Sequence, residues 1–306
     1  MKRLGFASAI VPELSLEELA AFASEERFST LEVMCWPTGK AERRYAGVTH
    51  LDVASVTDEK AEQVKRLCRE HQIEISALGY YPNPLDADLE KREVYVGHLR
   101  RLIEAAPKLG VNTVNTFIGR VQHAGIEDNF REFEKVWKPL IAFAEERGVR
   151  IGIENCPMYF TQDEWPAGQN MAYSPPIWER MFETIPSANF GLNYDPSHLL
   201  WMQMDYIRPI YDFKDRLFHV HIKDAKVYRD KLARVGILAT PLEYHSPKLP
   251  GLGDIDWGAF FSALADVRYK GPLVIEVEDK AYEDSLESRK SAIRQSRDYV
   301  SAYLAK

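Results

Sequence analysis

Acidic and imidazole side chains stand at the carboxyl ends of four consecutive apolar segments in the second half of the chain. They are Glu154, Asp195, His221 and Glu276. Three carboxylates brought together away from water would repel one another unless a cation neutralised them. Three oxygen donors and one imidazole suit a hard to borderline divalent ion, which makes Mn²⁺ the expected metal, with Mg²⁺ or Co²⁺ as alternatives. The four residues are therefore predicted metal ligands.

The alternation of side chains along a strand predicts that these groups point the same way. In the segment 217–223, Phe218, Val220 and Ile222 share one face, which should pack on helices. His221 and Lys223 then point to the other face, and the same reasoning turns the three carboxylates inward. A single such residue is more often a helix cap, a surface ion pair or a packed core histidine. Four of them on consecutive strands favour a metal site.

The elements that would position these residues alternate along the whole chain as short β-rich and longer amphipathic segments. The predicted strands are Leu4–Ser8, Thr30–Cys35, Ile73–Gly79, Val111–Phe117, Val149–Asn155, Asn189–Asn193, Leu217–Ile222 and Leu273–Val277. The predicted helices are Ser15–Glu26, Thr57–Glu70, Asp88–Leu109, Glu127–Arg147, Pro176–Ile185, Gln203–Lys214, Asp256–Val267 and Asp284–Leu304. This order predicts an α/β fold, a (β/α)8 TIM barrel, as a single domain over residues 1–306. An open doubly wound sheet is the alternative, although no GxGxxG pattern follows the first strand.

Local signals support several of these boundaries. Ser15 followed by Glu18 predicts a capping box at the start of the first helix. Gly110 and Gly148 follow helical segments, where a left-handed residue commonly ends a helix. The stretches 156–175 and 223–255 are too long for barrel turns, and long loops in compact domains usually carry function. Loops that follow barrel strands build the active site, so both stretches are expected there.

Composition and charge exclude several classes of protein. The hydrophobic fraction of 45% is that of a globular protein, and the net charge of −7 argues against a nucleic-acid partner. The three cysteines are far apart in the sequence and form no CxxC pair, which predicts a reduced, cytoplasmic setting. No apolar run is long enough for a membrane span, so no membrane partner is expected. Assembly into a homo-oligomer is left open.

Several segments together resemble a known family. They are Ile153–Asn155, Asn193–His198, His219–Asp224, Pro250–Trp257 and Ile275–Glu276. In order and spacing the chain is similar to the sugar phosphate isomerase/epimerase family of xylose isomerase-like barrels, whose relatives include D-tagatose 3-epimerase, hydroxypyruvate isomerase, inosose dehydratase and endonuclease IV. The resemblance implies that Glu154, Asp195, His221 and Glu276 hold the metal. It also implies that Glu154 and Glu276 act as the proton-transfer bases, and that His198 takes part in catalysis by contacting substrate or metal-bound water.

The predicted substrate contacts are less specific than the predicted metal ligands. Lys223 points inward and could hold an oxyanion or a phosphate, or pair with Asp224 or Glu276. Glu278 shares the face of Glu276, and Trp36 could stack on a sugar ring or simply pack. Where the family's epimerases carry a substrate-binding Arg a few residues beyond the metal histidine, this chain has Lys226 and Val227. The departure leaves the substrate open.

These groups suit proton transfer next to a carbonyl. A divalent ion stabilises the developing enediolate as a Lewis acid, while a positioned glutamate removes the proton. The expected activity is a metal-dependent isomerase or epimerase acting on a small sugar, sugar phosphate or polyol. The alternative is a lyase that eliminates water or an aglycone from a keto-sugar, a 3-oxo-glycoside or a keto-inositol at the same metal site. A nuclease and a non-catalytic carbohydrate-binding barrel are the weaker alternatives.

Overall fold

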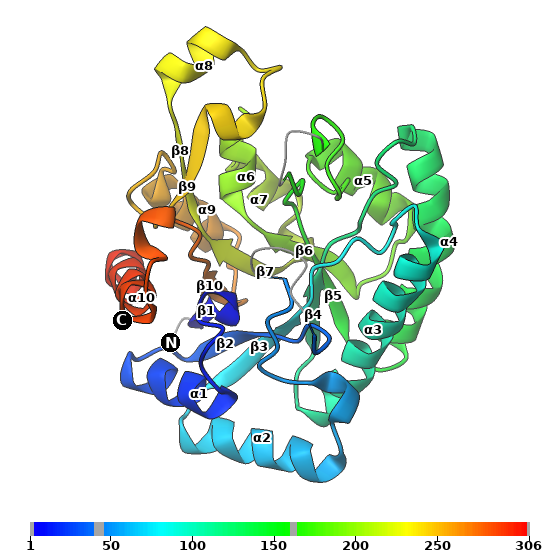
Figure 1. Ribbon diagram of the computed structural model, residues 1–306, viewed down its shortest axis with the longest axis vertical. Coiled ribbons are helices and arrows are strands. Elements are labelled where there is room, and N and C mark those ends of the chain that lie inside the picture. The colour runs from blue at the N-terminus through cyan, green and yellow to red at the C-terminus, as the bar shows by residue number, and fades with distance from the viewer. Residues whose placement is uncertain (1–2, 40–45, 160–163, 305–306) are drawn as a thin grey trace.

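The computed structural model describes residues 3–39, 46–159 and 164–304. Eight parallel strands close into a barrel in the order β1-β10-β7-β6-β5-β4-β3-β2, with helices around them (Figure 1). The barrel strands are β1 (Leu4–Ala7), β2 (Thr30–Met34), β3 (Glu74–Gly79), β4 (Thr113–Thr116), β5 (Arg150–Glu154), β6 (Phe190–Tyr194), β7 (Leu217–Ile222) and β10 (Leu273–Ile275). The predicted TIM barrel is confirmed, and all eight predicted strands lie within a few residues of observed ones.

The helices of the outer ring follow the strands along the chain. They are α1 (Leu16–Glu25), α2 (Asp58–Glu70), α3 (Leu89–Lys108), α4 (Ile126–Glu145), α5 (Pro175–Thr184), α6 (Pro196–Trp201), α7 (Arg208–Asp212), α9 (Trp257–Asp266) and α10 (Leu286–Ser301). Short 3₁₀ turns also occur, among them Ser8–Ile10, Val53–Ser55 and Pro241–Glu243. Within the part of the chain that the structure describes, no helix is long and apolar enough to cross a membrane.

The predicted local signals act as expected. Ser15 Oγ accepts a hydrogen bond from the backbone N–H of Glu18, and the Glu18 carboxylate accepts one from the N–H of Ser15, which completes the capping box. Gly110 and Gly148 have φ angles of +74° and +65°, the left-handed conformation that ends α3 and α4. Trp137 is fully buried between helices and barrel, and its indole N–H donates to the Ile118 carbonyl at 2.9 Å.

Side chains on non-neighbouring strands meet inside the barrel. Ser76 Oγ on β3 lies 3.1 Å from His219 Nε2 on β7, and Glu32 Oε2 on β2 lies 2.6 Å from His221 Nε2 on β7. Because β7 is a neighbour of neither β2 nor β3, these contacts run through the interior. The inward direction predicted for His221 is therefore confirmed, and His219 points the same way.

The predicted helix Gln203–Lys214 is wrong. The α-helix within that range is the short α7, because α6 begins directly after β6 and ends at Trp201, and the chain then turns before α7. Asp195 caps α6 by accepting a hydrogen bond from the N–H of Ser197, and Pro196 occupies the first helical position. Gln203 takes a φ of +60°, which a continuous helix does not allow.

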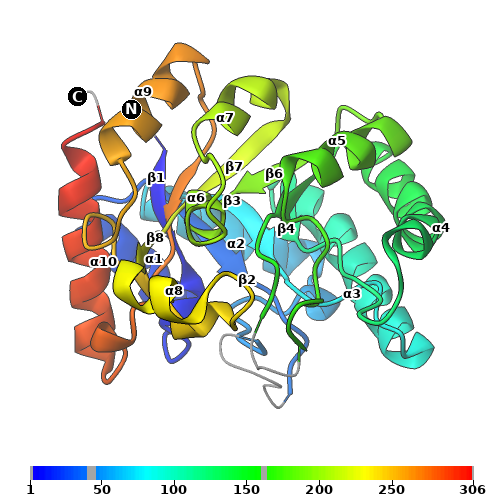
Figure 2. The ribbon, with the colours of Figure 1, turned by 90° about the horizontal axis from the view of Figure 1, so that it is seen from above.

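The stretch 223–255 is not the irregular loop that its length suggested. It contains β8 (Asp224–Val227), α8 (Arg229–Val235) and β9 (His245–Lys248), with β8 and β9 paired antiparallel. We call residues 224–248 the arm; Figure 1 shows it projecting from the ring of helices at the top of the view. Trp165, in the long stretch after β5, donates its indole N–H to the arm at the Leu238 carbonyl, 3.0 Å away. Both long stretches therefore lie on the same side of the barrel, as Figure 2 also shows.

The base of the arm is fixed by one buried carboxylate, that of Asp224. Its Oδ1 accepts hydrogen bonds from the backbone N–H groups of Ala225 and Ile255. Its Oδ2 accepts from the N–H of Gly251 and the indole of Trp257. A Cβ atom at Gly253 would lie 2.1 Å from the same carboxylate, so the backbone can pass only as glycine. The Pro250–Trp257 segment of the family resemblance thus has a structural role.

Candidate metal centre

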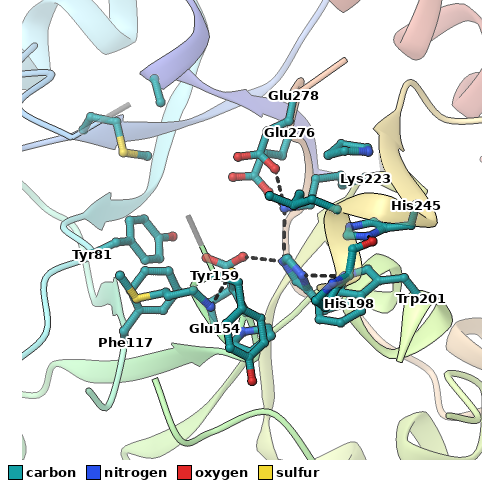
Figure 3. Close-up of a pocket in the computed structure, with 18 of the residues that line it drawn as sticks. Tyr81, Phe117, Glu154, Tyr159, His198, Trp201, Lys223, His245, Glu276 and Glu278 are labelled. Atoms are coloured by element: carbon teal, nitrogen blue, oxygen red, sulfur yellow. Dashed lines mark hydrogen bonds and ion pairs between the residues drawn. The ribbon is translucent and has the colours of Figure 1, made fainter. Parts of the chain in front are cut away.

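The four predicted metal ligands converge at the carboxyl ends of their strands. Glu154 is the last residue of β5, Asp195 follows β6, His221 lies in β7 and Glu276 follows β10. One donor atom from each lies within 4.8 Å of a donor atom of every other. Glu154 and Glu276 face the same space from different sides in Figure 3. The side chains of Glu154, Asp195 and His221 are almost wholly buried, whereas that of Glu276 is 21% exposed.

His221 has the geometry of a metal-binding imidazole held by a carboxylate. Its Nε2 donates to Glu32 Oε2 at 2.6 Å, and the carboxylate can only accept. Its Nδ1 is buried without a hydrogen-bond partner, 3.7 Å from Glu154 Oε1 and 3.4 Å from Glu276 Oε2. Ligands about 2.1 Å from one metal ion are separated by similar distances. The orphaned Nδ1 and the oxygens around it therefore fit a divalent ion.

The two carboxylate oxygens of Asp195 have different roles: one caps a helix and the other faces the site. Oδ1 caps α6 at 2.8 Å from the N–H of Ser197. Oδ2 is buried without a hydrogen bond and lies 2.9 Å from the ammonium of Lys223. The helix-cap role, which is the ordinary reading of such a residue, thus coexists with an oxygen that faces the other predicted ligands.

Lys223 lies among carboxylates rather than facing an open anion site. Its Nζ lies 2.6 Å from Glu276 Oε2, 2.9 Å from Asp195 Oδ2 and 3.1 Å from Glu278 Oε2. The alternative pairing of Lys223 with Glu276 that the sequence left open is therefore present. The alternative pairing with Asp224 does not form, since the Asp224 carboxylate accepts four other hydrogen bonds. A direct role of Lys223 in substrate binding stays a prediction.

His198, on α6, lies at the edge of the four-residue cluster. The indole N–H of Trp201 donates to its Nδ1 at 3.4 Å, and its Nε2 lies 3.2 Å from the ammonium of Lys223. Nε2 lies 3.2 Å from Asp195 Oδ2 and 3.5 Å from Glu154 Oε1. The imidazole thus directs its Nε2 toward the site. Its ring is tied to the helix that follows β6.

Charge pairing keeps the site ionised despite burial. Burial acts to raise the pKa of Glu154, but neighbouring His198 and His221 lower it to about 2. Burial likewise opposes the ionised form of Glu276, yet Lys223 and His221 hold its pKa below the usual value. Burial acts to lower the pKa of Lys223, and the surrounding carboxylates raise it well above its usual value. Both glutamates are therefore carboxylates at neutral pH and can accept a proton.

A pocket of about 210 Å³ opens over these groups. The described residues that line it include the predicted site residues Trp36, Glu154, His198, Lys223, Glu276 and Glu278. Trp36 is 8% exposed and stands after the end of β2. The remaining lining is mostly apolar or aromatic and comes from the ends of β2 and β4, the stretch after β5, α6 and the arm.

Glu32 is the site residue that the sequence prediction missed. Its carboxylate is fully buried on β2 and, besides His221, accepts hydrogen bonds from Tyr81 Oη and from Asn115 Nδ2. Burial acts to raise its pKa, but His221 lowers it below the usual value. The signal was present, because Leu31 and Val33 mark the outward face and a glutamate between them must point inward.

Comparison with curated proteins finds partial relatives and one nearly full-length relative. The chain is 26% identical to the uncharacterized protein YfiH of Bacillus subtilis (strain 168), over 90% of this chain and 93% of that protein. It is 33% identical to an inosose dehydratase of Clostridium perfringens, over 31% of this chain and 33% of that enzyme. It is 26% identical to a ketose 3-epimerase of Arthrobacter globiformis, over 44% of this chain and 36% of that enzyme.

A structural superposition and a family model also place the chain among xylose isomerase-like barrels. A solved structure of the IolI protein with a bound zinc atom superposes with a TM-score of 0.73 at 19% identity, covering 100% of both chains. The model of the xylose isomerase-like TIM barrel family matches residues 20–303. Since that match spans nearly the whole barrel, this chain belongs to the xylose isomerase-like TIM barrel family.

Proposed function

We propose that this protein is a divalent-metal-dependent isomerase or epimerase that moves a proton next to the carbonyl group of a sugar-like substrate. The observation that carries the proposal is the placement of Glu154 and Glu276. Both carboxylates face one pocket, from strands β5 and β10, which are separated by two other strands in the barrel. A substrate between them presents a different face to each, so one carboxylate can remove a proton and the other can return one.

The donor set suits a divalent ion held by Glu154, Asp195, His221 and Glu276. Such an ion would act as a Lewis acid on a substrate oxygen and make the neighbouring C–H more acidic. We propose Mn²⁺, because three of the four donors are carboxylates, with Mg²⁺ and Co²⁺ as alternatives. The zinc atom bound in the IolI structure adds Zn²⁺ to the metals that an assay must include.

The substrate that fits this lining is unphosphorylated. Lys223 is the one lysine or arginine among the described residues that line the pocket, and its ammonium already pairs with three carboxylates. Phosphate recognition normally uses uncommitted cationic side chains or helix N-termini. Carboxylates instead accept hydrogen bonds from sugar hydroxyls, and Glu278 is placed to do so.

A lyase is the second candidate, and His198 favours it. Its Nε2 lies 3.5 Å from Glu154 Oε1, where the protonated imidazole can give a proton to a departing hydroxyl or alkoxyl group. The partial similarity to inosose dehydratase supports the same reading. Elimination needs one base and this acid, whereas epimerisation needs both glutamates.

Hydrogen exchange in D₂O tests the proposal. Protein loaded with Mn²⁺, Mg²⁺, Co²⁺ or Zn²⁺ is incubated with a panel of ketoses, keto-inositols and 3-oxo-glycosides, and products are read by NMR. We expect a deuterated epimer or isomer that approaches equilibrium, abolished by Glu154→Gln or Glu276→Gln and retained by the exposed control Glu59→Gln. An irreversible unsaturated product without epimer would promote the lyase. No exchange with any metal and substrate would overturn both candidates.

A further inference from the structure

The wall of the pocket beside His198 is aromatic and comes from three separate segments. We call Tyr159, Trp201 and His245 the aromatic wall. The rings of Trp201 and His245 stack with centroids 4.8 Å apart and planes inclined by 19°. Tyr159 meets Trp201 edge to face at 6.3 Å. All three residues line the pocket, and Figure 3 shows them grouped on the side of His198.

The aromatic wall begins at the proposed catalytic groups and continues onto the arm. The ring of Trp201 lies 6.4 Å from that of His198 and donates its N–H to it. His245 belongs to β9 of the arm, which also contributes Pro241, Leu242 and Pro247 to the lining. Leu242 lines the pocket while remaining 52% exposed, which places it at the rim.

Polar and apolar lining are thus segregated within one pocket. The groups that can bind hydroxyls, Glu154, Lys223, Glu276 and Glu278, come from the ends of β5, β7 and β10. The aromatic wall and the arm offer rings and aliphatic carbons instead. A polyol placed against them could stack its C–H groups on the rings but would leave most of its hydroxyl groups without hydrogen-bond partners, which is unfavourable. An apolar substituent in the same place gains from leaving water.

Building on the proposed function, we propose that the substrate is a glycoside-like compound whose sugar ring lies among the carboxylates and whose apolar or aromatic substituent lies against the aromatic wall and Leu242. The pocket would then select for the substituent as well as for the sugar. The segregation of the lining carries this inference. A free monosaccharide would use only the polar part.

Binding of unreactive glycosides tests the substituent subsite separately from catalysis. Calorimetry with Mn²⁺-loaded protein compares methyl and phenyl β-D-glucopyranosides, and the matching galactopyranosides. Burial of a phenyl group predicts about 10- to 100-fold tighter binding of the phenyl member of a pair. Leu242→Ala and His245→Ala should reduce that preference several-fold. Leu238→Ala, on the same arm but 84% exposed and outside the lining, should leave it unchanged.

The outcomes separate this inference from the proposed function. Equal binding of methyl and phenyl members in both pairs, including pairs in which neither binds, would overturn the subsite. So would an equal effect of Leu242→Ala and Leu238→Ala on the preference. Proton exchange with simple ketoses in D₂O but no phenyl preference would leave the proposed function standing without the subsite. A phenyl preference without any proton exchange would support the substituent subsite and contradict the proposed function.

Discussion

Replacing Glu32 by Gln should weaken divalent-metal binding about 10- to 100-fold, although Glu32 is not one of the predicted ligands. Its carboxylate accepts the Nε2–H of His221 at 2.6 Å, on the side of the ring opposite the orphaned Nδ1. A carboxylate in this position fixes the ring's orientation and makes the other nitrogen a better electron donor. A neutral amide of the same shape keeps the packing and removes the charge.

The magnitude follows from the nature of the lost contact. A hydrogen bond to a charged group contributes about 1.5–3 kcal/mol, and Glu32 is fully buried, so little solvent screening reduces it. A loss of 10- to 100-fold in affinity corresponds to about 1.4–2.7 kcal/mol, which overlaps most of that range. A larger effect would mean that His221 had left its place in the site.

Competition with a chromophoric chelator for Mn²⁺ and Zn²⁺ measures the affinity, and thermal unfolding with excess chelator measures the stability of each variant. Ser76→Ala is the matched control, because Ser76 contacts His219 in the same barrel interior but touches no predicted ligand. We expect weaker metal binding in Glu32→Gln alone. If Glu32→Gln binds metal as tightly as the parent protein, or if both variants lose affinity in proportion to their loss of stability, the positioning argument is wrong.

Three further changes have expected outcomes. Asp195→Ala or His221→Ala should lose metal by elemental analysis, whereas His198→Ala should keep it and lose turnover; equal metal loss in all three would contradict the assigned roles. Burial acts to lower the pKa of His221, but Glu32 and Glu276 hold it well above its usual value, so a metal ion must displace a proton from Nδ1. Metal affinity should therefore fall as the pH falls. Calorimetry in two buffers of different ionisation heat should show proton release on metal binding, and an absence of proton release would refute this. Asp224→Ala should lower the free energy of unfolding, measured in urea, by about 3–5 kcal/mol, because four buried N–H donors lose their acceptor. A loss under about 1 kcal/mol would show that the arm does not depend on the Asp224 carboxylate.

The fold was predictable where periodicity and neighbouring residues suffice. The eight strands, the capping box at Ser15 and the glycines after α3 and α4 depend on residues close in sequence. The pairing of β8 with β9 does not depend on such neighbouring residues, since Val227 and His245 pair across a long connection that no local pattern specifies. Pro247 within β9 further disguises that strand, because proline is rare in strands. Helix α6 was missed for a different reason: Asp195, which caps it, was assigned only to the metal.

The inward direction of the predicted ligands was also predictable, but their partners were not. Side-chain alternation turns Lys223 inward, yet its three carboxylate neighbours come from the ends of β6 and β10, whose registers with β7 no local pattern specifies. The interior is also altered by a register shift between β2 and β3 beside Glu32, where Ser76 is the extra residue.

The net charge of the assembled site supports the predicted metal ion independently of the positions of its ligands. Five carboxylates, those of Glu32, Glu154, Asp195, Glu276 and Glu278, surround the ammonium of Lys223 and the imidazoles of His198 and His221. Even with both imidazoles protonated, negative charge remains in excess in a buried place, where unbalanced charge is costly. Lys223 offsets part of that excess from the Asp195 and Glu276 side, while His221 Nδ1 faces Glu154 and Glu276 without a hydrogen bond. A divalent cation at Nδ1 would satisfy both the unpaired nitrogen and the remaining negative charge.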